Sequence, residues 1–200
     1  MGDNYTHFKL PEKILNPMME VAAASLLKMP QKNIEDIING DKFVDVKTGA
    51  VVDKGAKGAV SGGPAVEALL KRIDVDDAYD EAVAEANKAK SGTELNKANR
   101  RLRYLKQLRK SKMKPTDYMI ENVLVVPPKY RPMFSMGVDK TVIMSDINDL
   151  YQQAAMSRET MADMKKAVEV TGGGADVESV MLAPARASMY QDVKAVMGLR

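Results

Sequence analysis

The spacing of apolar residues predicts helices over most of the chain. Residues 10–30 are typical of a helix that is interrupted at Pro17, because proline lacks an N–H and fixes φ. Residues 31–40 predict a second helix with Gly40 as its C-terminal cap. The apolar face of this second helix comprises Ile34, Ile37 and Ile38.

A few stretches follow other patterns. Residues 42–46, KFVDV, alternate, and residues 119–126, MIENVLVV, are rich in Val and Leu, so both predict strands. Gly and other small residues dominate residues 47–63, which indicates a flexible loop or linker. Residues 134–144 predict a hairpin or a loop. The chain is therefore expected to be mainly α with a small β element.

The middle of the chain predicts a helical hairpin. Pro64 suits the first position of a helix, residues 76–90 have an acidic start, and residues 91–112 are basic. Ser91 and Gly92 separate the last two segments, which are expected to pair in antiparallel fashion. The buried stripe of the basic helix is expected to comprise Leu95, Ala98, Leu102, Leu105 and Leu108.

The basic run over residues 97–114 has two readings. It could face the phosphates of a nucleic acid, or it could be a solvated face that offsets the acidic partner helix. No aromatic platform is interleaved with the basic residues, so the residues alone favour the solvated face.

The C-terminal part carries the clearest periodic signal. Ser145 can cap a helix that has Asp146 and Asp149 in its first turn. Two segments with a 3-4 spacing flank a glycine-rich turn at residues 171–176, which predicts an antiparallel coiled-coil hairpin that projects about 30 Å. Ordinary packing against a helical bundle is the alternative, but the narrow apolar seam favours projection. The seam positions are Ile147, Leu150, Ala154, Ser157, Met161, Met164 and Val168, then Arg186, Met189, Val193 and Val196.

These elements suggest four parts. Residues 1–46 form an N-terminal helical and strand segment, and residues 47–63 form the linker. Residues 64–144 contain the helical hairpin, the strand and a proline corner, and residues 145–200 form the coiled-coil hairpin.

Composition excludes several classes of function. The 200 residues include no Cys and one His, so disulfides, thiolate metal sites, Cys nucleophiles and His-rich zinc sites are excluded. We find no phosphate-binding glycine motif and assign no catalytic residue and no metal ligand. The net charge of +3 is too small to indicate a partner. The N-terminus does not have the pattern of a signal peptide, and no apolar run is long enough to span a membrane. We therefore expect a cytoplasmic protein that makes no membrane contact and acts as a helical binding or structural module.

Two motifs identify a resemblance. VLVVPPKYRPM at residues 123–133 is similar to the VLPVxPPxxRPM-type segment of the β′ subunit of bacterial DNA-dependent RNA polymerase. SDINDLYQ at residues 145–152 resembles the family's SDLNDLYRR-type helix start. Further likenesses, such as GPAVEALLKRIDVD with GAEAIxxLLxxxDL, extend the resemblance in order over roughly residues 8–198.

The resemblance implies a role in transcription. The helical hairpin at residues 146–197 would correspond to the family's clamp helices, which bind sigma factors and elongation factors of the NusG type. The implied partners are other RNA polymerase subunits or β′ fragments and a sigma-like factor, with template DNA contacted indirectly. The implied partner-binding residues are Arg158, Glu159, Lys165 and Arg186, and the side chains of Arg158 and Arg186 are expected to be exposed. The residues that would anchor the hairpin to the clamp base are Pro127, Pro128, Arg131, Pro132, Asn148, Asp149 and Tyr151.

The sequence also departs from the family. The arginine-rich RRVINRNNRLKRLL is replaced by QQAAMSRETMADMKK, which suggests an unusual docking partner. The family's zinc ribbon and the magnesium-binding NADFDGD loop lie outside this chain, so no cofactor and no polymerisation by this chain alone are expected. A split, bacteriophage-type β′ subunit, a piece of a longer subunit, and a free-standing module that captures a sigma or transcription factor all stay open. A helical scaffold with accidental motif matches is a fourth possibility.

Overall fold

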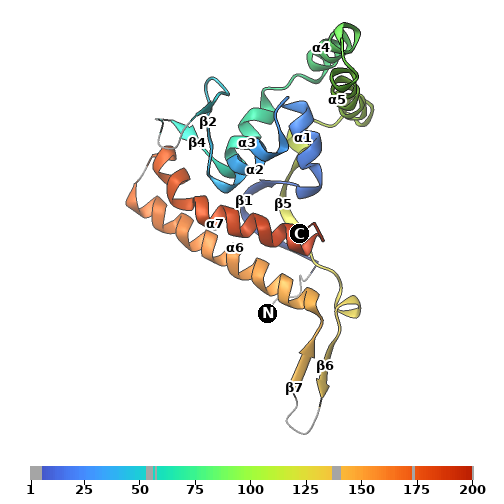
Figure 1. Ribbon diagram of the computed structural model, residues 1–200. Helices are drawn as coiled ribbons and strands as arrows, with labels where there is room; N and C mark the ends of the chain where they lie inside the picture. Colours follow the sequence, from blue (N-terminus) through green and yellow to red (C-terminus); the bar gives the residue numbers. More distant parts are fainter. Residues whose placement is uncertain (1–5, 53–55, 57, 137–140, 173, 200) are drawn as a thin grey trace.

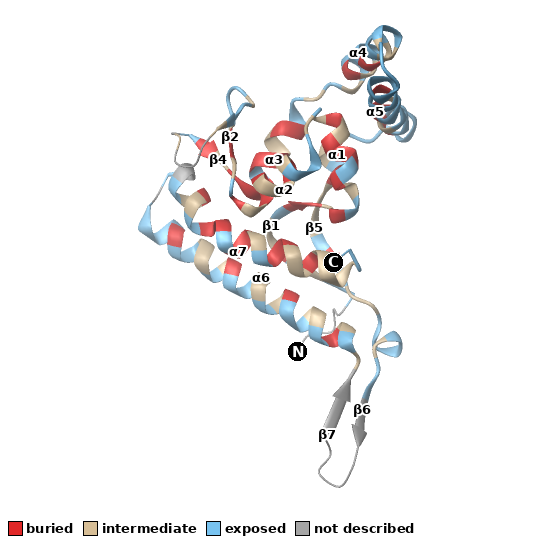
Figure 2. Cartoon of the chain, viewed as in Figure 1, coloured by how far each residue is buried: buried red, intermediate tan, exposed pale blue. Residues whose placement is uncertain are grey.

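A computed structural model describes residues 6–52, 56, 58–136, 141–172 and 174–199. It is mainly helical with small antiparallel sheets, as the sequence predicts (Figure 1). Within the described residues, no helix is both long enough and apolar enough to cross a lipid bilayer. Residues from the N-terminal half and from the C-terminal helices share a hydrophobic core, and Figure 2 shows buried residues concentrated where these segments meet.

A two-stranded sheet joins the N-terminus to the middle of the chain. Strand β1 (His7–Leu15) pairs antiparallel with β5 (Met119–Leu124), and Ile14 lies opposite Ile120. The prediction of a helix over residues 10–30 is therefore wrong for its first part. Residues 10–15 have a strand partner that is distant in sequence, and this pairing overrides local propensity. The helical prediction holds only after Pro17, in the 3-10 turn η1 (Pro17–Met19) and in α1 (Glu20–Leu26).

Two further helices and a second sheet complete the body of the protein, the name used here for the described residues of 7–71 together with β5. Helix α2 (Gln31–Asn39) buries the predicted apolar face, and Gly40 caps it with a φ of 81°. Helix α3 (Gly62–Lys71) packs against α2 and β1. Strand β2 (Phe43–Asp45) confirms the strand predicted at residues 42–46.

The stretch expected to be a linker contains ordered structure. Strands β3 (Val51–Val52) and β4 (Ala59–Val60) flank β2 on its two sides. Residues 53–55 and 57 of this stretch lie outside the described residues. At the end of this stretch, Ser61 is buried against α7. The Ser61 hydroxyl donates a hydrogen bond to the carbonyl of Ser179 at 3.3 Å.

The predicted middle hairpin is confirmed. Helices α4 (Val75–Lys88) and α5 (Gly92–Ser111) pack against each other. Asp74 caps α4, and Ser91 with Glu94 forms a capping box at the start of α5. Leu105 and Leu108 are buried as expected, whereas Leu95 is exposed near the end of the hairpin. Figure 1 shows this hairpin beside α1, at the opposite end of the body from β6 and β7.

The chain then runs through the 3-10 turn η2 (Pro115–Tyr118) into β5. A second turn, η3 (Pro128–Tyr130), leads to the antiparallel strands β6 (Met133–Met136) and β7 (Thr141–Met144). These strands correspond to the hairpin or loop predicted at residues 134–144, of which residues 137–140 lie outside the described residues.

The C-terminal helices form the predicted hairpin but do not project from the body. Helix α6 (Asp146–Thr171) packs on α7 (Ala175–Val196), and α7 lies between α6 and the rest of the protein (Figure 1). Helix α7 contacts α2, α3 and β4 as well as α6. It can do so because its apolar surface is wider than one seam, with Leu182, Ala183, Ala185, Met189, Tyr190 and Val193 all buried.

Candidate functional site

The proline corner and the start of α6 form one joint, here called the corner joint (residues 126–132 and 145–151). Arg131 lies at its centre, because its Nε donates to the carbonyl of Val126 at 2.8 Å and its Nη1 donates to Asn148 Oδ1 at 2.9 Å. The Asn148 amide donates back to the carbonyl of Arg131 at 3.2 Å. Asn148 is buried, so these bonds are shielded from competing water.

Tyr151 ties the same joint to β5. Its hydroxyl accepts from the backbone N–H of Val126 at 3.0 Å and donates to the carbonyl of Leu124 at 3.2 Å. One side chain of α6 thereby satisfies two backbone groups at and just beyond the end of β5. The pair of motifs that carries the family resemblance is thus a set of side chains in mutual contact.

The prolines shape the corner without being buried. Pro127 precedes η3, Pro128 begins it, and the carbonyl of Pro132 accepts from the N–H of Ser145 at 3.4 Å. All three prolines are exposed, and so is Asp149 in the first turn of α6. Ser145 holds the N-cap position as predicted, but its side chain makes no capping hydrogen bond.

An ion pair fastens α7 to the N-terminal strand. Arg186 donates to the two carboxylate oxygens of Glu12 at 2.7 and 2.8 Å, and both side chains are buried. The guanidinium lies over Gly62, where an added Cβ would come within 2.5 Å of Arg186 Cδ. The pair therefore joins β1, α3 and α7 at one point.

A second buried polar cluster fastens the C-terminal turns of α7. The Tyr190 hydroxyl donates to Glu20 Oε1 at 2.6 Å, and Lys194 Nζ lies 2.8 Å from the same oxygen. Burial, and then the hydrogen bond to Glu20, raise the pKa of Tyr190, so the hydroxyl keeps its proton as a donor. Burial alone would lower the pKa of Lys194, but Glu20 and then Glu35 outweigh it and raise that pKa.

The structure separates the four residues implied in partner binding. Arg186 is 3% exposed and engaged with Glu12, so the expectation of an exposed side chain is wrong. The reason is that its seam position faces the body rather than solvent. Arg158 Nε donates to the carbonyl of Lys9 at 2.7 Å, and Lys165 Nζ approaches the carbonyl of Pro11 at 3.4 Å. Glu159 is exposed.

Sequence reasoning missed the residues that hold α7 in place. Glu12 and Glu20 lie in a segment that was assigned to one helix, so no pairing with α7 was expected. The clearest available signal was the arginine at a seam position, because an inward-facing guanidinium requires a buried acid. The paired glycines before Pro64 were a signal for the close packing of α3 on β1, since a Cβ at Gly63 would come within 1.8 Å of the carbonyl oxygen of Lys13.

No model of a protein family matches the chain. Curated relatives carry the name DNA-directed RNA polymerase subunit β′. The subunit of Chromobacterium violaceum is 34% identical over 95 residues, which are 48% of this chain and 7% of that protein. The subunit of Thermosipho africanus is 35% identical over 123 residues, covering 60% of this chain and 7% of the relative. The subunit of Streptococcus mutans is 38% identical over 105 residues, covering 52% of this chain and 8% of the relative. These identities relate roughly half of the chain to a region of a β′ subunit, and the chain spans less than a tenth of these relatives.

Proposed function

We propose, because this chain is related to a region of the DNA-directed RNA polymerase β′ subunit, that it is a non-catalytic clamp piece of such a polymerase. In this proposal the α6–α7 hairpin docks a sigma-like or elongation factor during transcription. The other polymerase subunits hold the body, and the corner joint sets the direction in which α6 leaves it. The chain itself contributes binding and no reaction step.

One observation carries the docking role. A line of exposed side chains with a 3-4 spacing, here called the α6 stripe, runs along the face of α6 opposite to Ala154, Met161 and Val168, which are buried. Met156 and Val170 in this line are 60% and 88% exposed and stand among polar and charged side chains, a mixture that a partner with matching apolar and polar groups can contact. The α6 stripe consists of Asp149, Gln152, Met156, Glu159, Asp163, Lys166 and Val170.

The charge of the α6 stripe narrows the choice of partner. It carries three carboxylates and one lysine, and Lys166 lies 3.6 Å from Asp163, so two carboxylates have no cation beside them in the line. A docking factor with basic and apolar side chains would complement this surface. The replacement of the family's arginine-rich helix agrees with a partner of changed charge.

Purification from the native source tests the polymerase assignment. The tagged chain should be recovered together with other polymerase subunits or β′ fragments. Recovery of a sigma-like factor with no polymerase subunit would contradict the clamp assignment. It would favour the alternative, a free-standing β′-like module that captures a sigma or transcription factor.

A charge reversal tests the docking face. Glu159→Lys should weaken binding of the co-purified factor about tenfold, because a carboxylate that attracts a basic surface becomes a repelling ammonium. Asp80→Lys, on the exposed side of α4, is the matched control and should leave binding unchanged. Equal binding by both variants would show that the factor docks elsewhere.

A further inference from the structure

We propose that the groove between α1 and the α4–α5 hairpin binds an acidic, amphipathic segment of a protein partner. This surface does not include the α6 stripe, and the inference does not rest on the proposed factor docking. It follows from three features of the described residues: an apolar floor, a charge network that holds the walls in place, and a rim of basic side chains.

The groove has a volume of about 760 Å³. Its apolar lining comes from α1, from the turn that leads into α2, and from the facing ends of α4 and α5. Val21 is 41% exposed although it lies on a helix of the body, so apolar surface is open to solvent here. The apolar lining residues are Val21, Ala24, Met29, Pro30, Ala89 and Ala98.

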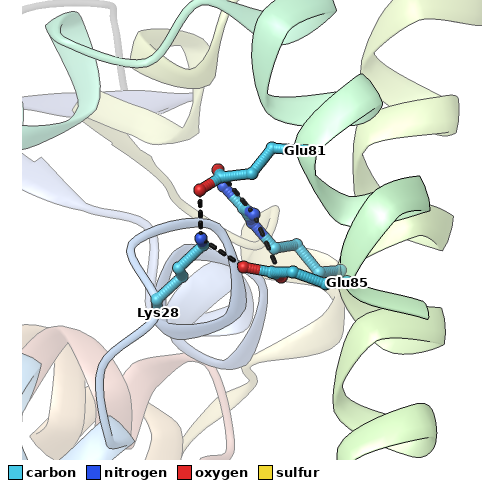
Figure 3. A network of polar contacts seen from close by, with 4 residues as sticks. Lys28, Glu81 and Glu85 are labelled. Atoms are coloured by element: carbon cyan, nitrogen blue, oxygen red, sulfur yellow. Dashed lines mark hydrogen bonds and ion pairs between the residues drawn. The ribbon is translucent and has the colours of Figure 1, made fainter. Parts of the chain in front are cut away.

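The walls are joined by ion pairs, shown in Figure 3. Lys28, at the end of α1, reaches Glu81 at 2.6 Å and Glu85 at 2.5 Å on α4. Arg101 of α5 approaches the same two carboxylates at 3.1 and 3.5 Å. These four charges neutralise one another and fix α1 against the hairpin. The groove is therefore formed before any partner arrives, which lowers the entropic cost of binding.

The rim differs from the walls in its charge balance. Lys88, Lys97 and Arg100 line the groove and are exposed, and none makes a side-chain hydrogen bond or ion pair within the described part of the chain. Glu94, the remaining acid of the lining, accepts from the backbone N–H groups of Lys90 and Ser91 in the capping box. The rim thus presents cations that lack carboxylate partners.

An apolar floor with a cationic rim matches a segment that has apolar side chains on one side and carboxylates on its edges. Nucleic acid fits this groove less well, because its backbone offers phosphates and the groove offers no aromatic side chain for stacking. A nucleic acid would find cations without apolar surface on the outer side of α5, at Arg103, Lys106 and Lys110, which are exposed.

The test uses three labelled probes and fluorescence anisotropy with the full chain. The first probe is a synthetic helical peptide of Leu and Glu at amphipathic spacing, the second has every Glu replaced by Lys, and the third is a DNA duplex. The double variant Lys97→Glu/Arg100→Glu should weaken binding of the Glu peptide about tenfold. Val21→Ser should weaken it severalfold by removing apolar contact.

Lys106→Glu/Lys110→Glu makes the same change in net charge on the outer side of α5 and should alter binding less than twofold. Circular dichroism and urea unfolding of each variant should match those of the parent chain. The proposal is overturned if the parent chain does not bind the Glu peptide, if it binds the Lys peptide as well, or if both double variants lose binding equally. Displacement of the Glu peptide by the DNA duplex would also overturn it, in favour of a nucleic-acid surface.

Discussion

Arg131 and Asn148 exchange hydrogen bonds, one in each direction, at 2.9 and 3.2 Å. The arginine belongs to the proline corner and the asparagine to the first turns of α6, so the two motifs are halves of one contact. Strands β6 and β7 lie between the two motifs in the sequence, so the chain runs out from the corner joint along β6 and back to it along β7. An asparagine suits this place because its side chain both accepts and donates, which an aspartate cannot do when ionised.

Asn148→Ala should destabilise the corner joint. The substitution removes the acceptor of Arg131 Nη1 and the donor to the Arg131 carbonyl, and an unpaired buried partner costs about 1–3 kcal/mol. Urea unfolding measures the change in the free energy of unfolding. Gln152→Ala, which truncates an exposed amide on the same helix, should change that free energy by less than about 0.5 kcal/mol. Equal effects of the two substitutions would contradict a structural role for the exchange.

Arg186→Met should have a larger effect. It leaves the buried carboxylate of Glu12 without its bidentate partner, and breaking a buried pair in this way costs about 3–5 kcal/mol. Adding Glu12→Gln should recover part of the loss, because the uncompensated charge is then removed. Arg103→Met, at an exposed position of α5, provides the control in the same urea titrations. If the double variant is no more stable than Arg186→Met alone, the unpaired charge is not the cause.

Local periodicity was sufficient to predict the helices whose partners are near in sequence. The face of Ile34, Ile37 and Ile38 and the pairing of α4 with α5 are examples, since neighbouring apolar positions define both. It failed for residues 10–15, whose partner strand begins at Met119. No local pattern distinguishes an apolar strand from a helix when the contact that decides between them is so distant.

In the candidate site, too, the sequence predicted some features and not others. The family motifs indicated Arg131, Asn148 and Tyr151, and the structure brings these side chains together. The direction of the α6–α7 hairpin could not be predicted. The spacing of apolar residues along the two helices indicates how they pack on each other, but not how either helix packs on the rest of the protein. Arg186 was therefore expected at the surface although it lies in the interior.

The ion pairs that Lys28 and Arg101 form with Glu81 and Glu85 should make the free energy of unfolding depend on pH in the acidic range. The hydrogen bond from Lys28 is the largest cause that lowers the pKa of Glu81 below its usual value of 4.5. A lowered pKa in the folded state means that the contribution of Glu81 is present above pH 4.5 and is lost as the pH falls through the folded value. Urea unfolding from about pH 3 to about pH 6 should show this loss, and Glu81→Gln should flatten it. Asp80→Asn, on an exposed part of the same helix, should keep the parent profile, and an unchanged profile for Glu81→Gln would contradict the assignment.

Alanine substitutions at two glycines can distinguish the effect of backbone strain on stability from the effect of a steric clash. Gly40 and Gly58 have φ values of 81° and 77°, so alanine at either position costs about 1 kcal/mol of backbone strain. At Gly40 the new Cβ would also lie 2.3 Å from Ala183 Cβ on α7, whereas at Gly58 no atom of the described residues lies within 4 Å. Gly40→Ala should therefore lower the free energy of unfolding by roughly 1–3 kcal/mol more than Gly58→Ala, because α7 must shift away from α2. Urea unfolding measures both variants, and Gly40→Ala/Ala183→Gly should recover only part of the difference, because a glycine inside α7 itself costs about 1 kcal/mol. Equal destabilisation by the two single substitutions would mean that α7 does not lie against the end of α2 in solution.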